Sequence, residues 1–128
     1  MKVEPVDNSI SFGYHNSLKT LFKKGKFPQV QFGFYGDLIN NKNVTLEHVL
    51  PVSKGGKTEL KNLVLASARK NNGRGNQPLV DFIDWKIALA YFDQFKGIRV
   101  RGFNGDYYRE IGIQNVIDVV GKEINLLT

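Results

Sequence analysis

The chain has 128 residues, no cysteine and two histidines, and its 18 basic and 12 acidic side chains give a formal net charge of +6. This length suits one domain with a modest core, and the lack of cysteine excludes disulfides, thiol nucleophiles and cysteine-ligated zinc or iron–sulfur sites. The positive charge favours a polyanionic partner, nucleic acid before a membrane surface. No apolar run suits a signal peptide or a membrane span, so the sequence predicts a cytoplasmic protein.

The first third of the chain predicts one short helix and an extended segment. Residues 1–16 show no regular pattern, and Ser17 is placed to cap a helix that ends near Gly25. Apolar residues partly alternate over residues 26–37, which predicts extended structure with glycine bends. The polar residues 40–43 then predict a turn.

The middle of the chain predicts two strands followed by a helix. Residues 44–51 are rich in β-formers and end at Pro51, and a loop with two glycines follows over residues 53–59. The apolar residues 63–65 predict a short buried strand, and residues 67–75 predict a short helix.

The last third predicts two helices with a hairpin between them. Residues 78–95 carry the strongest helical periodicity, with Pro78 in the first turn. Asn104-Gly105 lies between two β-prone runs and predicts a hairpin, and apolar residues recur at helical spacing from about Gln114. These elements show no βαβ repeat and predict a compact α+β fold, with residues 1–128 as a single domain.

One segment in the middle of the chain combines several features that are weak alone. In order, they are Glu47-His48, Pro51, Gly55-Gly56, Asn62-Leu63, Asn71 and Arg74. Together they resemble the motif of the HNH endonuclease family, over about residues 44–76. The resemblance implies a ββα-metal core, flanked by N-terminal and C-terminal elaborations. It also implies hydrolysis of DNA phosphodiester bonds, leaving 5′-phosphate and 3′-hydroxyl ends.

The resemblance also implies a role for each polar position. His48, a side chain that titrates near neutral pH, would be the general base that deprotonates water. Glu47 and Asn71 would hold one divalent ion, and their oxygens are hard donors suited to Mg²⁺ or Mn²⁺. Asn62 would complete the catalytic set by bracing the loop that carries the histidine. Arg74 would contact the scissile or the adjacent phosphate.

Two questions about this site stay open in the sequence. Successive side chains of a strand point to opposite sides, so Glu47 and His48 can serve one site only if the strand ends or twists there. Asn72 is an alternative to Asn71 as the ligand, although Asn71 shares a helical face with Arg74.

Positive charge gathers around the motif. Between residues 47 and 76, six basic side chains stand against two acidic ones. The residues expected to bind the nucleic-acid backbone are Lys54, Lys57, Lys61, Lys70 and Arg74. Such contacts give sequence-independent, salt-sensitive binding. A second basic and aromatic cluster, which fits either nucleic-acid stacking or an ordinary amphipathic hairpin, consists of Arg99, Arg101, Tyr107, Tyr108 and Arg109.

Two alternatives to a stand-alone nuclease remain at this point. One is a nucleic-acid-binding module without catalysis, and the other is a nuclease subunit or toxin-like effector that acts only with a partner protein. The sequence leaves open whether the substrate is DNA or RNA. It also leaves open whether a homodimer forms to cut both strands of a duplex.

Overall fold

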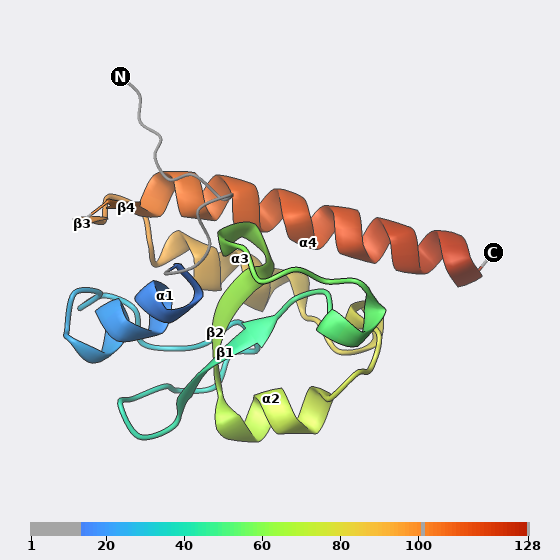
Figure 1. Cartoon of the computed structure of the whole chain (residues 1–128), viewed down its shortest axis with the longest axis horizontal. Helices are drawn as coiled ribbons and strands as arrows, with labels where there is room; N and C mark the ends of the chain where they lie inside the picture. Colours follow the sequence, from blue (N-terminus) through green and yellow to red (C-terminus); the bar gives the residue numbers. More distant parts are fainter. Residues whose placement is uncertain (1–13, 101, 128) are drawn as a thin grey trace.

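The computed structural model describes residues 14–100 and 102–127, and it mixes helices with two small antiparallel sheets (Figure 1). In chain order, the elements are α1 (Tyr14–Lys23), β1 (Val44–His48), η1 (Val52–Lys54), η2 (Leu60–Asn62), β2 (Leu63–Ser67), α2 (Ala68–Arg74), η3 (Leu79–Asp81), α3 (Trp85–Asp93), β3 (Arg99–Val100), β4 (Phe103–Asn104) and α4 (Gly105–Leu127), where η marks a short 3-10 helix. The α+β class expected from the sequence is confirmed. None of the helices within the described ranges is both long and apolar enough to cross a membrane.

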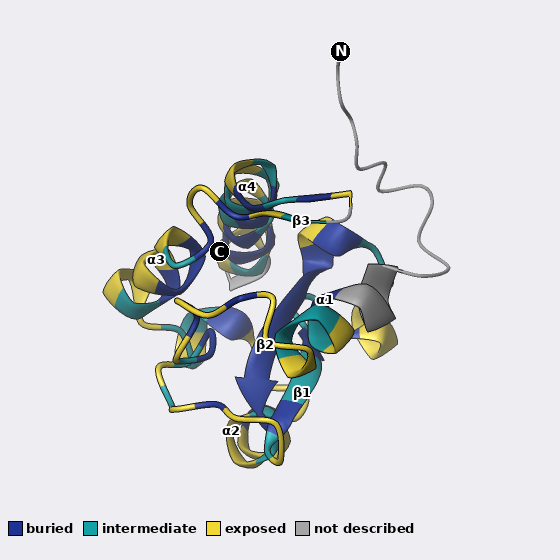
Figure 2. Cartoon of the chain, turned by 90° about the vertical axis from the view of Figure 1, so that its left-hand side faces the viewer, coloured by how far each residue is buried: buried dark blue, intermediate teal, exposed yellow. Residues whose placement is uncertain are grey.

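The centre of the fold is the hairpin of β1 and β2. The strands pair antiparallel, so that Val44 lies opposite Ser67 and His48 lies opposite Leu63. All five residues of β2 are buried, and Figure 2 shows this strand in dark blue through the middle of the molecule. Helix α2 begins directly after β2 because the Ser67 side chain caps it, accepting a hydrogen bond from the backbone N–H of Lys70 at 3.2 Å.

Two tyrosine hydroxyls attach the C-terminal helices to β2. The Tyr91 hydroxyl of α3 accepts a bond from the Leu65 N–H at 2.9 Å. The Tyr108 hydroxyl of α4 donates to the Leu63 carbonyl at 2.7 Å, and the two hydroxyls lie 3.0 Å apart. Around them the rings of Phe92 and Phe95 pack edge-on against both tyrosines. The hairpin therefore sits on a rigid aromatic core.

The single helix predicted over residues 78–95 is wrong, because the segment is divided into η3 and α3. Asp84 stands between them in an extended backbone conformation, and its carboxylate accepts bonds from the N–H groups of Lys86 and Ile87. The carboxylate thus caps a new helix. Glu123 of α4 meanwhile accepts bonds from the N–H groups of Leu79 and Val80, both at 2.8 Å.

The hairpin turn predicted at Asn104-Gly105 is also wrong. The pair β3–β4 is only two residues long on each side, and Asn104 instead caps α4 by accepting a bond from the Tyr107 N–H at 3.1 Å. Gly105 is required there because a Cβ would lie 1.9 Å from the Phe95 carbonyl oxygen. Helix α4 therefore begins nine residues before Gln114 and continues through Gly121.

The N-terminal expectations need two corrections. Helix α1 already includes Tyr14, so Ser17 lies within it and is not its cap. The segment predicted to be extended, residues 26–37, forms no strand and has one isolated bridge, between Phe32 and Leu38. Residues 1–13 and Arg101, for which the sequence also carried expectations, lie outside the described residues.

Candidate active site

The end of β1 and the helix α2 bring three of the predicted site residues around one cavity. Glu47, His48 and Asn71 all line this space, which has a volume of about 370 Å³. Its other lining residues are Pro51, Val52, Ser53, Asn72, Gly75 and Asn76. Because β1 ends at His48, neighbouring side chains of the strand reach the same cavity.

His48 is held by a residue of the glycine-containing loop. Its Nε2 atom lies 2.9 Å from the Thr58 hydroxyl oxygen, within hydrogen-bonding distance. The imidazole is only partly buried, so the ring stays in contact with the cavity. Thr58 was not singled out in the sequence, since a threonine in a turn carries no signal of its own.

Glu47 is buried, and two side chains bond to one oxygen of its carboxylate. Oε2 accepts a hydrogen bond from the Tyr35 hydroxyl at 2.7 Å and another from Nη1 of Arg74 at 3.4 Å. Burial raises the pKa of Glu47 above its usual value, while the Tyr35 hydrogen bond and the Arg74 charge oppose that rise. Burial and the nearby Glu47 charge raise the pKa of Tyr35, so the phenol keeps its proton and donates.

Asn71 is oriented by β1. Its Nδ2 group donates to the Thr45 hydroxyl at 3.0 Å and to the Leu46 carbonyl at 3.1 Å. These two bonds use both amide protons, so the oxygen Oδ1 is the atom left to act as a ligand. Asn72 lines the same cavity, but it is exposed and makes no such side-chain bond with the described residues.

Asn62 lies behind the loop between the strands. Its side chain is 3% exposed, accepts from the Leu50 N–H at 2.9 Å, and donates to the carbonyls of Leu50 and Lys57 at 3.0 and 2.9 Å. Nδ2 of Asn115, in α4, donates to its oxygen at 3.1 Å. These bonds close the loop that follows His48.

The expected phosphate contact of Arg74 does not fit its position. The arginine side chain has no exposed surface, because it extends into the interior beneath Glu47. Its guanidinium donates to Glu47 Oε2, the Tyr35 hydroxyl and the His48 carbonyl, and Nε donates to the Gln77 carbonyl. We therefore correct the expectation: Arg74 is an internal partner of Glu47 and not a surface contact for DNA.

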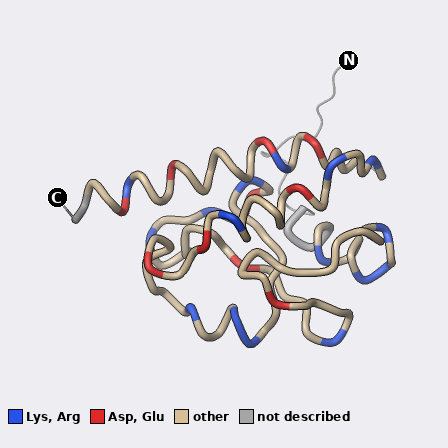
Figure 3. The backbone as a smooth tube through the Cα atoms, turned by 180° about the vertical axis from the view of Figure 1, so that it is seen from behind, with Lys and Arg blue, Asp and Glu red and all other residues tan. Residues whose placement is uncertain are grey.

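The remaining basic residues near the motif are exposed. Lys54, Lys57, Lys61 and Lys70 all lie on the surface, and α2 carries basic side chains and no acidic one. Figure 3 shows basic positions at the lower edge of the molecule, where α2 lies.

Part of the second basic and aromatic cluster makes contacts within the fold, and Arg101 lies outside the described residues. Tyr108 is fully buried in the core, Arg109 bonds to Asp93 at 2.6 Å, and Arg99 lies 3.7 Å from Asp106. These contacts use the side chains within the fold.

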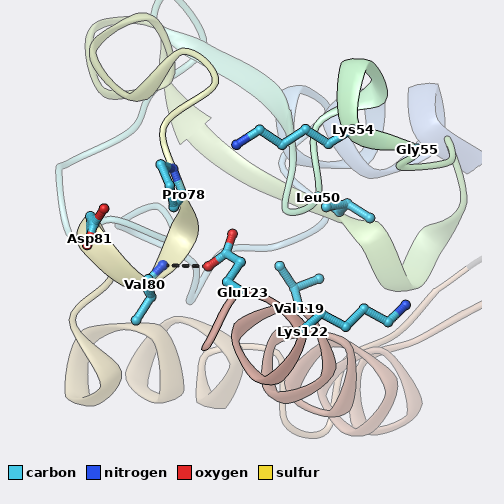
Figure 4. Close-up of a pocket in the computed structure, with 9 residues that line it drawn as sticks. All are labelled: Leu50, Lys54, Gly55, Pro78, Val80, Asp81, Val119, Lys122 and Glu123. Carbon is cyan, nitrogen blue, oxygen red and sulfur yellow. Dashed lines mark hydrogen bonds between the residues drawn. The ribbon is translucent and has the colours of Figure 1, made fainter. Parts of the chain in front are cut away.

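A second, larger cavity lies between the same loop, η3 and α4. It measures about 500 Å³, and Figure 4 shows Leu50, Val80 and Val119 forming its apolar walls. The carboxylate of Glu123, at its base, accepts hydrogen bonds from the backbone N–H groups of Leu79 and Val80. Its lining includes charged side chains but neither a histidine nor an asparagine, the residue types that accompany Glu47 in the first cavity.

The donor set in the first cavity fits a hard divalent ion. Among the described residues, no three His, Cys, Asp or Glu side chains gather into a metal cluster. One carboxylate and one amide oxygen remain, from Glu47 and Asn71, and such a sparse oxygen set suits an ion that keeps several waters. Tyr35, which bonds to Glu47, was missed in the sequence because it lies in an irregular segment 12 residues upstream.

Comparison with protein families gives one match. Residues 35–78 match the family model described as HNH endonuclease, a span that begins at Tyr35 and includes both strands and α2. Searches of curated proteins and of solved structures gave no significant match. The matched span contains Glu47, His48, Asn62, Asn71 and Arg74, the residues on which the resemblance rested. In residues 35–78, this chain therefore carries a domain of the HNH endonuclease family.

Proposed function

We propose that the protein is a metal-dependent endonuclease that hydrolyses phosphodiester bonds of DNA, with one Mg²⁺ or Mn²⁺ ion per site. The observation that carries the proposal is the meeting of Glu47, His48 and Asn71 around one cavity within the segment that matches the family. A carboxylate, an imidazole and an amide oxygen supply the ligands and the base that this hydrolysis needs.

Each side chain has a separate task in this proposal. His48, held by Thr58, takes a proton from the water that attacks the phosphorus. Glu47 and Asn71 would hold the ion with a carboxylate and an amide oxygen, since Oε2 of Glu47 and Nδ2 of Asn71 already have partners. A bound divalent ion would neutralise negative charge on the phosphate and on the leaving 3′ oxygen. Lys57, Lys61 and Lys70 attract the DNA backbone.

Supercoiled plasmid provides the direct test. The purified protein is incubated with plasmid in Mg²⁺, Mn²⁺ or chelator, beside His48→Ala, Asn71→Ala and the neighbouring control Asn72→Ala. We expect cleavage only with metal, a loss of about 100-fold or more in the first two variants, and near wild-type cleavage in the control.

Other outcomes would change the assignment. If Asn72→Ala loses cleavage and Asn71→Ala keeps it, the ligand is Asn72. If the wild type and the His48 variant cut alike, the activity does not belong to this site. DNA binding without cleavage favours a silent binding module, and cleavage restored by an added protein favours a nuclease subunit. The ratio of nicked to linear product reports strandedness, and a parallel RNA substrate tests the choice of DNA.

A further inference from the structure

We propose that Tyr35 is a positioning residue for the metal site, which with Arg74 holds one oxygen of Glu47 and leaves the other as the ligand atom. This inference rests on the proposed function, because it assumes that Glu47 holds the ion. It assigns a task to a residue outside the strand–loop–strand–helix motif.

The two donors converge on the same atom. The Tyr35 hydroxyl lies 2.7 Å from Oε2 of Glu47, and Nη1 of Arg74 lies 3.4 Å from it. The backbone N–H of His48 is a third donor to this carboxylate. A carboxylate held in this way cannot rotate freely, so its second oxygen keeps one direction relative to the cavity that Glu47 lines.

The ring of Tyr35 is itself fixed. It packs edge-on between Phe34, at a centroid distance of 5.1 Å, and Phe82, at 5.0 Å. The backbone beside it is tied to β2, because the Phe34 N–H donates to the Leu65 carbonyl at 2.9 Å. Gly33 makes this approach feasible, since a Cβ there would lie 2.9 Å from the backbone of β2 at Leu65 and Ala66.

Arg74 connects Tyr35 and Glu47 to His48, the proposed general base. Its Nη1 atom lies 3.2 Å from the Tyr35 hydroxyl and 3.2 Å from the His48 carbonyl oxygen. The same guanidinium nitrogen therefore contacts the positioning phenol, the ligand carboxylate and the backbone of the proposed general base. Tyr35 is the better residue to test, because replacing it with Phe removes one hydroxyl and no buried charge.

The experiment measures Mn²⁺ binding to the whole chain by isothermal titration calorimetry. The variant is Tyr35→Phe, which keeps the packed ring. The matched control is Tyr108→Phe, which also removes a buried hydroxyl. The Tyr108 hydroxyl donates to the Leu63 carbonyl at 2.7 Å, the same distance as the bond from Tyr35 to Glu47, but neither Tyr108 nor Leu63 lines the cavity. We expect Mn²⁺ affinity to fall about 10-fold or more in Tyr35→Phe and to stay near the wild-type value in Tyr108→Phe.

Plasmid cleavage supplies a second readout. Tyr35→Phe should need a higher Mn²⁺ concentration for half-maximal cleavage while its KM for DNA stays unchanged, a split that a general loss of folding would not produce. Equal weakening of Mn²⁺ binding in Tyr35→Phe and Tyr108→Phe would overturn the positioning role.

Glu47→Gln separates this inference from the proposed function. If Glu47→Gln abolishes Mn²⁺ binding and Tyr35→Phe leaves it unchanged, the role of Tyr35 is overturned and the metal site stands. If Mn²⁺ binds Glu47→Gln as well as the wild type, Glu47 is not the ligand. That result overturns both the metal assignment and the role of Tyr35.

Discussion

The side chain of Asn62 and the backbone of Leu50 are joined by two reciprocal hydrogen bonds. The Leu50 N–H donates to the asparagine oxygen, and the asparagine amide donates back to the Leu50 carbonyl. The two residues are 12 positions apart and lie on opposite sides of the glycine-containing loop. This reciprocal pair fixes the backbone two residues after His48, directly before Pro51, which lines the cavity of the candidate site.

Asn62→Ala should therefore destabilise the protein by about 2 to 3 kcal/mol, because it leaves the Leu50 groups and the Lys57 carbonyl without their buried partner. Urea unfolding followed by circular dichroism measures the change. The control is Asn41→Ala, an exposed asparagine, which should cost no more than about 0.5 kcal/mol. Equal stability of Asn62→Ala and the wild type would contradict the bracing role.

The two glycines of the loop should respond very differently to alanine. Gly55 has φ of +93° with nothing near its missing Cβ, so Gly55→Ala should cost only backbone strain, about 1 to 2 kcal/mol. A Cβ on Gly56 would lie 1.8 Å from the Leu50 carbonyl oxygen, so Gly56→Ala should cost about 3 kcal/mol or more. Urea unfolding of both variants tests the order, and a reversed order would contradict the loop geometry.

The raised pKa of Glu47 predicts how stability varies with pH in metal-free buffer. Because burial raises this pKa, the folded protein binds the proton more tightly than the unfolded chain does. The contribution of Glu47 to stability is therefore present at low pH and is lost as pH rises through the folded-state pKa.

Glu47→Gln isolates this effect, because it removes the titrating group and leaves the others. The free energy of unfolding of the wild type, minus that of Glu47→Gln, should fall as pH rises above the usual pKa of a glutamate, in the presence of EDTA. Urea titrations at several pH values measure it. A difference that rises over this range would show that the Arg74 charge outweighs burial.

Lys70 and Arg74 lie four residues apart on α2 and should have separable effects. Lys70→Gln should weaken DNA binding for all sequences and reduce the slope of log affinity against log salt by about 1. Arg74→Met should leave that slope unchanged and instead cost about 3 kcal/mol of stability, because it leaves the Glu47 carboxylate buried without its cation.

Fluorescence anisotropy with a labelled duplex in EDTA, over a range of KCl concentrations, measures the salt slopes without cleavage. Urea unfolding supplies the stabilities. If folded Arg74→Met shows the smaller slope and Lys70→Gln does not, Arg74 reaches the phosphate and our correction is wrong.

The sequence predicted the ββα core well because the signals there are local. Each of these signals is carried by a few neighbouring residues: the strand propensity before Pro51, the glycines of the loop and the residues that start the helix directly after β2. The corrections arose where a side chain overrode a periodic pattern. Asp84 caps a new helix inside a continuous apolar repeat, and Asn104 caps α4 where a hairpin turn was predicted.

The candidate site could likewise be predicted only in part from the sequence. The positions of Glu47, His48 and Asn71 around one cavity agree with a motif read along the chain. The contacts of Tyr35 and Thr58 could not be predicted, since they depend on how an irregular segment and a turn fold back. Arg74 was expected at the phosphate because the family resemblance and its planar guanidinium favour that contact. Its contacts with Glu47, Tyr35 and two backbone carbonyls explain its burial.

The long helix α4 contacts the segment 35–78 from outside it, through Asn115 on Asn62, and Glu123 of the same helix holds the start of η3, directly after that segment. The segment is thus not a portable module: grafting residues 35–78 onto another scaffold would carry the active-site residues but leave both supports behind. Conversely, a change confined to α4, such as one at Asn115, would alter how firmly the loop between β1 and β2 is held.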